Sequence, residues 1–267
     1  MSREQLGARG LDQLRDELSG RDLAIVGQVA ELRLMSARQL EAVHFPSNEH
    51  DSQAAAARAC RRSLDRLAQH RLLVRAERRI GGVRAGSASY CYSLGPVGQR
   101  VLNIGGPRRR FREPSTAFAI HTLAVAQLVV DLTLATRQKQ FDLLVCQAEP
   151  RCWRQFNAMG GATVLRPDLF LSLGVSEFEH RWFVEVDRGT EHLPALVRKC
   201  RLYDAYYRSG REQATYQVFP RVCWLVPDEA RVLQLQGAIT GDQQLTRGLF
   251  CVTTTKQALK VLARGPS

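Results

Sequence analysis

The chain has 267 residues, of which 45% are hydrophobic and 24% charged, and its formal net charge is +12. This composition is typical of a soluble globular protein and excludes an intrinsically disordered chain, and the length allows one large domain or two ordinary ones. The seven cysteines are scattered without a C-x-x-C pair, and the six histidines add no metal-ligand spacing. Both observations disfavour a zinc site or a disulfide framework.

The N-terminal residues are polar and of mixed charge, without the apolar core of a signal peptide. No apolar stretch approaches the ~18 residues that a membrane span needs, and the longest ones contain Gln127, Asp131 or Glu185. We therefore expect a cytoplasmic protein with no membrane partner.

The positive charge is concentrated in one part of the sequence. Between Arg58 and Arg112 there are 14 arginines against only Asp65 and Glu77, a local excess of +12, so the other 212 residues sum to zero. A localised basic segment predicts polyanion binding by one part of the molecule, with a solvated basic face as the alternative.

Three helices and a ribbon are predicted in the N-terminal part. The first helix follows Ser19 as a candidate N-cap. The second covers 36–45, with Ser36 as its cap, and is stopped by Pro46, and the third begins near Asp51. Residues 73–95 then predict a two-stranded ribbon around a Gly-rich turn.

Three helices followed by a basic hairpin is the order of a winged helix-turn-helix. We expect the third helix to enter the major groove and the wing to lie along phosphates, because the arginine fork pairs with phosphate or with a guanine edge. A winged helix that contacts proteins is the alternative. The predicted DNA-binding residues are Arg58, Arg61, Arg62, Arg66, Arg75, Arg78, Arg79, Arg84, Arg108, Arg109 and Arg110.

Residues 95–115 contain four glycines, three prolines and a run of arginines, which predicts a linker. We expect a DNA-binding domain over 1–105, a basic linker over 106–115 and a second domain over 116–267.

The second domain is predicted to begin with a long apolar helix from Thr116 to about Arg137. The predicted order is α-β-β-β-α-β followed by α-β-α, which places the chain in the α/β class (α+β overall). The predicted strands are 141–150, 162–173, 181–189, 221–227 and 249–254, and the helix between the third and fourth strands covers 191–210.

Carboxylates fall at the ends of these strands. Glu149 follows the apolar run "LLVCQA" near the end of the first, Asp168 lies within the second, and Glu185 and Asp187 close the third. Because side chains alternate along a strand, Glu185 and Asp187 share a face, and pairing with the strand of Asp168 would bring three carboxylates to one edge. Such a cluster suits one or two Mg²⁺ or Mn²⁺ ions and phosphodiester hydrolysis.

The order α-β-β-β-α-β, with Pro167-Asp168 on the second strand and Glu185 on the third, resembles the PD-(D/E)xK nuclease fold of restriction enzymes and junction resolvases. The resemblance implies that Asp168 and Glu185 bind a metal ion. Asp187 occupies the position of the family's lysine, which orients the attacking water. Lys199, 14 residues after Glu185, is similar to the lysine that some members supply from the following helix.

Stretches spread over both predicted domains also carry a closer resemblance, to the actinobacterial replication-relaxation family of plasmid and mobile-element proteins. This resemblance implies a part in plasmid replication or DNA relaxation, with DNA as the partner. The matching stretches are "GRDLAIV", "HTLAVAQL", "AEPRCWR", "LRPDLFL", "WFVEVDRGTE", "RKCRLYDAYYRSGREQ" and "FPRVCWLVP".

Three interpretations remain open at this point. In the first, Asp168 and Glu185 bind metal, Glu149 or Asp187 completes the shell, and Lys199 positions water or stabilises phosphate charge. In the second, the same residues form ion pairs on an inactive nuclease scaffold of a DNA-binding regulator or replication accessory protein. In the third, the winged helix binds proteins. A homodimer is compatible with each.

Aromatic residues near these acids are expected to serve the core. Tyr203, Tyr206 and Tyr207 lie at helical spacing, which predicts packing rather than base stacking. Trp153, which follows Glu149, either lines the cleft of the predicted acidic site or packs in the core.

Overall fold

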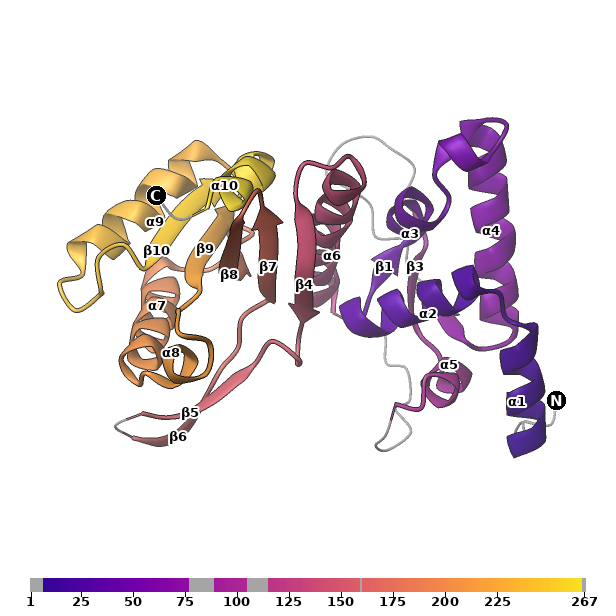
Figure 1. Cartoon of the computed structure of the whole chain (residues 1–267), viewed down its shortest axis with the longest axis horizontal. Helices are drawn as coiled ribbons and strands as arrows, with labels where there is room; N and C mark the ends of the chain where they lie inside the picture. Colours follow the sequence, from indigo (N-terminus) through magenta and orange to yellow (C-terminus); the bar gives the residue numbers. More distant parts are fainter. Residues whose placement is uncertain (1–6, 77–88, 105–114, 159, 266–267) are drawn as a thin grey trace. The chain divides into compact units, whose positions relative to one another are not determined.

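The computed structural model describes residues 7–76, 89–104, 115–158 and 160–265. The chain divides into two compact units, Met1–Val130 and Asp131–Ser267 (Figure 1). Both units combine helices with strands, so the mixed α/β class is confirmed. The boundary between the units falls inside helix α6 (Thr116–Arg137). Residues 106–114 of the expected linker lie outside the described residues, and the domain limits given above stay a prediction.

The first unit combines short helices with a three-stranded antiparallel sheet in the order β1-β3-β2. Both predicted N-caps are confirmed, since Asp22 N donates to Ser19 Oγ over 3.1 Å and Gln39 N donates to Ser36 Oγ over 3.3 Å. The elements before α6 are α1 (Ala8–Glu17), α2 (Gly20–Leu32), β1 (Met35–Ser36), α3 (Ala37–His44), the 3₁₀ turn η1 (Ser47–Glu49), α4 (Gln53–Gln69), β2 (Leu73–Arg75), β3 (Cys91–Leu94) and α5 (Pro96–Val101).

Helix α5 occupies the first part of the stretch 95–115, where the composition predicted a linker. The glycines that suggested flexibility serve close packing instead. A Cβ at Gly95 would lie 2.1 Å from the carbonyl oxygen of Arg71, and one at Gly98 would lie 2.3 Å from that of Leu72. Only glycine lets α5 approach the backbone before β2 this closely.

A buried ion pair joins α2 to α4. Asp22 is 1% exposed, and both of its carboxylate oxygens accept from Arg66 Nη2, over 2.7 and 2.8 Å. The same carboxylate accepts from Ser19 N over 3.1 Å at the start of α2. Because a buried carboxylate needs its partners, this pair holds the two helices in place.

The second unit is built on a five-stranded sheet in the order β10-β9-β8-β7-β4, in which β4, β7 and β8 pair antiparallel and β8, β9 and β10 pair parallel. A separate hairpin, β5–β6, lies between β4 and β7 in the sequence. Its strands, helices and last 3₁₀ turn are β4 (Asp142–Ala148), β5 (Arg154–Ala158), β6 (Gly161–Leu165), β7 (Leu169–Val175), β8 (Phe178–Val186), α7 (Leu193–Arg208), α8 (Arg211–Tyr216), β9 (Arg221–Val226), α9 (Glu229–Gly241), β10 (Phe250–Thr254), η2 (Thr255–Gln257) and α10 (Ala258–Arg264).

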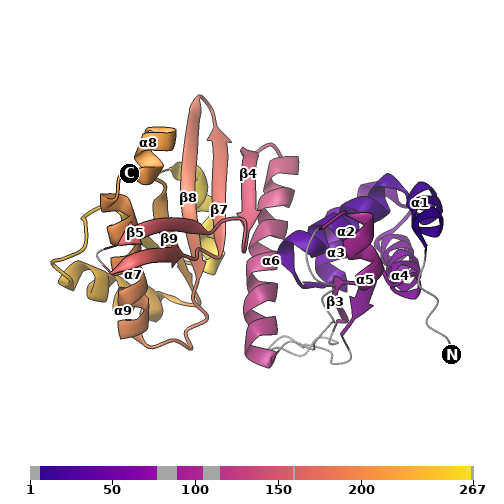
Figure 2. The same ribbon diagram turned by 90° about the horizontal axis from the view of Figure 1, so that it is seen from below.

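The strand predicted over 162–173 is divided in two. Residues 161–165 form β6 and pair with β5, whereas 169–175 form β7 in the main sheet. The break falls at Arg166-Pro167-Asp168, because proline has no N–H to continue a ladder. Hairpin β5–β6 therefore leaves the main sheet just before β7 begins (Figures 1 and 2).

Helices cover both faces of the five-stranded sheet. Leu196, Cys200 and Tyr203 of α7 and Leu235 of α9 pack with Phe183 in the main hydrophobic core. On the other face Trp182 Nε1 donates to the carbonyl oxygen of Leu262 in α10, over 3.2 Å. The main hydrophobic core thus holds β7, β8 and β9 against α7 and α9.

Helix α6 is the one described helix that is long and apolar enough to cross a membrane by length and composition. The sequence-based expectation that no stretch approaches this length is therefore wrong. A core helix of a soluble protein passes the same test, and Ala119, Ala126 and Leu132 are fully buried within the structure. By itself this helix is a weak indication of a membrane span.

The Asp22–Arg66 pair gives a stability prediction. Replacing Asp22 with Ala removes the buried ion pair with Arg66 and a contact at the helix start, so the free energy of unfolding should fall by about 1–3 kcal/mol, as measured by urea denaturation. Asp65→Ala is the control, because its contact with Arg75 is long, at 3.9 Å, and half exposed. The control should change stability by less than ~1 kcal/mol. Equal losses in the two variants would contradict the assigned role.

Candidate functional site

Pairing of β7 with β8 brings two acidic residues together. The register joins Leu169 to Val184, so Asp168 lies one step further along, beside Glu185. Val186 N donates to Asp168 Oδ2 over 2.7 Å. Both acids are buried, Asp168 at 7% and Glu185 at 1% exposure. The edge of the sheet therefore holds two carboxylates away from bulk water.

Helix α7 provides the partners of Glu185. Lys199 Nζ donates to Glu185 Oε2 over 2.5 Å, and the hydroxyl of Tyr203 donates to Glu185 Oε1 over 2.6 Å. Lys199 and Tyr203 are four residues apart, so they lie on one side of the helix, next to the stripe of Leu196 and Cys200 that packs on the sheet. Packing of this stripe places both donors at the carboxylate.

Burial dominates the ionisation of this group. The pKa of Glu185 is raised from its ordinary 4.5 to about 8, because burial outweighs the opposing effect of Lys199 and the charge of Asp168 adds to the rise. Burial lowers the pKa of Lys199, but Glu185 and Asp168 outweigh this effect and raise it overall. Burial and Glu185 also raise the pKa of Tyr203 well above 10.0. Lys199 is thus a cation held between two acids, and Tyr203 is a neutral donor.

The other two predicted acids have different partners. Asp187 directly follows the last residue of β8; its Oδ2 accepts from Arg231 Nε of α9 over 2.6 Å and its Oδ1 accepts from Gly189 N over 2.8 Å. Glu149 accepts from Trp153 Nε1 over 3.4 Å. Within the described residues, no group of three or more His, Cys, Asp or Glu side chains could hold a metal ion. The predicted convergence of three or four carboxylates is therefore not found.

The remaining pair of acids suits one hard cation rather than two. Asp168 and Glu185 carry two negative charges at full ionisation, against the single positive charge of Lys199. Mg²⁺ commonly binds one or two carboxylates and keeps several waters. Asp168 and Glu185 fit such an ion, although Glu185 would have to change its contacts with Lys199 and Tyr203.

The predicted DNA-binding arginines differ in their surroundings. Arg58, Arg61 and Arg62 are exposed on α4 and form no ion pair with another described residue. Arg66 binds Asp22, and Arg75 lies over the ring of Tyr90 at 4.4 Å. The other predicted DNA-binding residues, Arg78, Arg79, Arg84, Arg108, Arg109 and Arg110, lie outside the described residues.

Two residues of this region were not identified from the sequence as polar partners. Tyr203 was assigned to the core, where it does pack, but its hydroxyl also binds Glu185. Its spacing of four from Lys199 is a signal that could have found it. Arg231 lies 44 residues after Asp187, and no local pattern connects the two. Arg188 and Arg198, which are close in sequence to Asp187 and Lys199, are exposed.

The raised pKa of Glu185 gives a pH-dependent prediction. Between about pH 4.5 and pH 8 the folded protein retains a proton on Glu185 that the unfolded chain releases, so this group destabilises the fold as pH rises through that window. Glu185→Gln removes the titration. The stability of this variant relative to the wild type should therefore rise with pH, by at most about 1.4 kcal/mol per unit.

The measurement is urea unfolding at several pH values with EDTA present. Lys199 stays protonated throughout this range because its pKa is raised, so it adds no slope. A difference between the two proteins that does not vary with pH would contradict the burial-driven shift.

Comparison with known proteins adds one finding. A family model described as replication-relaxation matches residues 27–222, which include α4, the pair Asp168–Glu185 and helix α7. Searches among curated proteins and among solved structures found no match. Because the matched segment covers well over half of the sequence, the chain belongs to the replication-relaxation family.

Proposed function

We propose that this protein binds duplex DNA through its first unit and acts in plasmid or mobile-element replication or DNA relaxation. Family membership supports a role in replication and relaxation. The first unit has the element order of a winged helix-turn-helix, with α4 as the helix that enters the major groove. The observation that carries DNA binding is the row of exposed arginines on α4, Arg58, Arg61 and Arg62, whose charge no described acid neutralises. Neither the fold nor the family match supports the homodimer considered above.

We further propose that the second unit is a PD-(D/E)xK-like nuclease that nicks DNA with one Mg²⁺ or Mn²⁺ ion. The observation that carries this proposal is the contact of Lys199 with Glu185, next to Asp168. A lysine from the following helix thus reaches the carboxylates, although Asp187 occupies the usual lysine position. The bound ion would neutralise charge that develops on the phosphodiester.

The protein's own residues would have separate tasks. Asp168 and Glu185 would hold the ion. Lys199 would orient the attacking water or stabilise the charge on the phosphate. Tyr203 would fix the direction of Glu185, while Asp187 would join the end of β8 to α9 through Arg231.

A non-catalytic DNA-binding protein is the second candidate, and one observation favours it. Both oxygens of Glu185 already accept hydrogen bonds, from Lys199 and Tyr203. A carboxylate satisfied in this way has a structural reason to be present without a metal ion.

DNA binding is tested by removing charge from α4. The double variant Arg58→Gln/Arg62→Gln should bind a duplex more weakly, and the slope of log K against log salt should fall by about 2, because two phosphate contacts are lost. The control is Arg9→Gln/Arg15→Gln, which removes the same charge from exposed positions on α1. Fluorescence anisotropy at several salt concentrations measures both. Equal effects of the two double variants would show that net charge alone drives binding.

Nicking is tested on supercoiled plasmid with Mg²⁺ or Mn²⁺. Asp168→Asn, Glu185→Gln and Lys199→Met should each reduce the rate of nicking by about 100-fold or more, because each removes a ligand or a charged group that acts in the transition state. Glu177→Gln removes an exposed acid from the turn between β7 and β8 and should leave the rate unchanged. Absence of nicking by the wild type, with DNA binding intact, would establish the non-catalytic alternative.

A further inference from the structure

The hairpin β5–β6 projects from the second unit beside Asp168, and neither the sequence motifs nor the proposed catalytic site accounts for it (Figures 1 and 2). Its inner side is firmly held. The ring of Phe156 is buried against Tyr206 at 5.1 Å, and Arg154 lies over Phe170 at 5.0 Å while pairing with Glu212 at 3.4 Å. The hairpin is therefore a fixed ribbon.

The outer side of the ribbon is polar but carries no acid. Gln155 and Asn157 alternate with buried Phe156, so their amides face solvent. Residues 151–167 contain three arginines and no Asp or Glu. A two-stranded ribbon fits the major groove, and amide side chains pair with base edges there.

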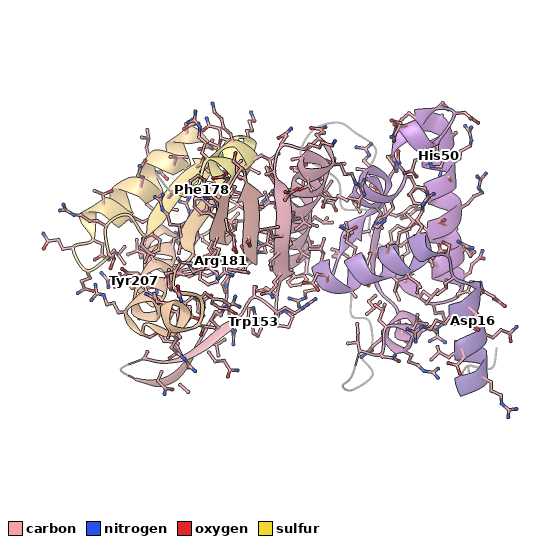
Figure 3. All side chains as sticks on the ribbon, in the orientation of Figure 1. Asp16, His50, Trp153, Phe178, Arg181 and Tyr207 are labelled. Carbon is pink, nitrogen blue, oxygen red and sulfur yellow. The ribbon has the colours of Figure 1, made fainter. Side chains whose placement is uncertain are left out.

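The base of the ribbon is joined to the predicted catalytic residues. Cys152 Sγ donates to the carbonyl oxygen of Pro167 over 2.9 Å, and Trp153 Nε1 donates to Glu149. Arg166, two residues before Asp168, lies over the ring of Trp153 at 4.7 Å (Figure 3 labels Trp153). Its side chain is exposed and forms no ion pair within the described part of the chain, so a cation faces solvent next to the acids.

We infer that hairpin β5–β6 is a second DNA-binding element, which holds duplex DNA beside the Asp168–Glu185 site. Arg166 contacts a backbone phosphate, Trp153 supports the guanidinium of Arg166, and Gln155 and Asn157 face the groove. This inference rests on the proposed DNA-binding function and adds to it the residues of the second unit that position the substrate.

Trp153 offers a direct readout of this contact. The other two tryptophans, Trp182 and Trp224, are 0% and 2% exposed, whereas Trp153 is only partly buried. Acrylamide should therefore quench mainly Trp153. A duplex of about 20 base pairs, the probe, should protect the quenchable emission in the wild type, and Trp153→Phe should lack this component.

Arg166→Gln tests the phosphate contact, with Arg247→Gln as the control of equal charge on the exposed loop before β10. Arg166→Gln should weaken binding in anisotropy measurements and reduce the salt slope by about 1 relative to the control. Circular dichroism confirms that both variants fold. The inference is overturned if the wild type binds the duplex without protecting Trp153 and if Arg166→Gln and Arg247→Gln bind with the same affinity and salt slope. The proposed function would still stand in that case. No binding by the wild type would overturn both.

Discussion

The carboxylate of Glu185 is buried at the end of β8, and the surrounding structure is arranged around the cost of placing it there. A buried carboxylate without partners is strongly destabilising, so its charge must be matched or its proton retained. Lys199 and Tyr203 provide one hydrogen bond to each oxygen. Both donors come from α7, so the polar contacts and the apolar stripe of that helix hold it in the same position on the sheet.

The break at Pro167 connects this carboxylate to the rest of the second unit. Because the ladder stops there, β7 starts at Leu169 and the preceding residue, Asp168, turns its carboxylate to the N–H of Val186. The same break releases β5–β6 as a separate ribbon, with Trp153 and Arg166 at its base. One backbone feature thus places an acid beside Glu185 and an exposed cation beside that acid.

Charged side chains in both units divide into two groups with different roles. Asp22 with Arg66, and Asp187 with Arg231, are ion pairs in which the acid is almost fully buried, and each joins two elements distant in sequence. These pairs act on the stability of the fold, because removing one partner leaves a buried charge without compensation. Exposed cations such as Arg58, Arg62 and Arg166 lack such partners among the described residues. Those cations are the ones available to a polyanion.

Local pattern was sufficient for much of the secondary structure. The caps at Ser19 and Ser36, the bounds of α6 and the strand β9 are set by neighbours within a few residues, so periodicity and capping rules find them. Pro167-Asp168, Glu185 and Lys199 were identified together through the resemblance to the PD-(D/E)xK fold rather than through a local pattern. Glycines at 95 and 98 misled the reading of the linker, because close approach and flexibility both select glycine.

Tertiary structure alone decided which of the acids belong together. Alternation along the predicted strand placed Glu185 and Asp187 on one face, and the sequence offered no reason to separate them. Their separation depends on α7 reaching one and α9 the other, through pairs 14 and 44 residues apart in the chain. The division of 162–173 into two strands also depends on a partner, since β6 pairs with β5 and β7 pairs with β8. The sequence by itself determined which residues can carry charge at the strand ends; long-range packing determined which partner neutralises each one, because that choice depends on distances that no local pattern encodes.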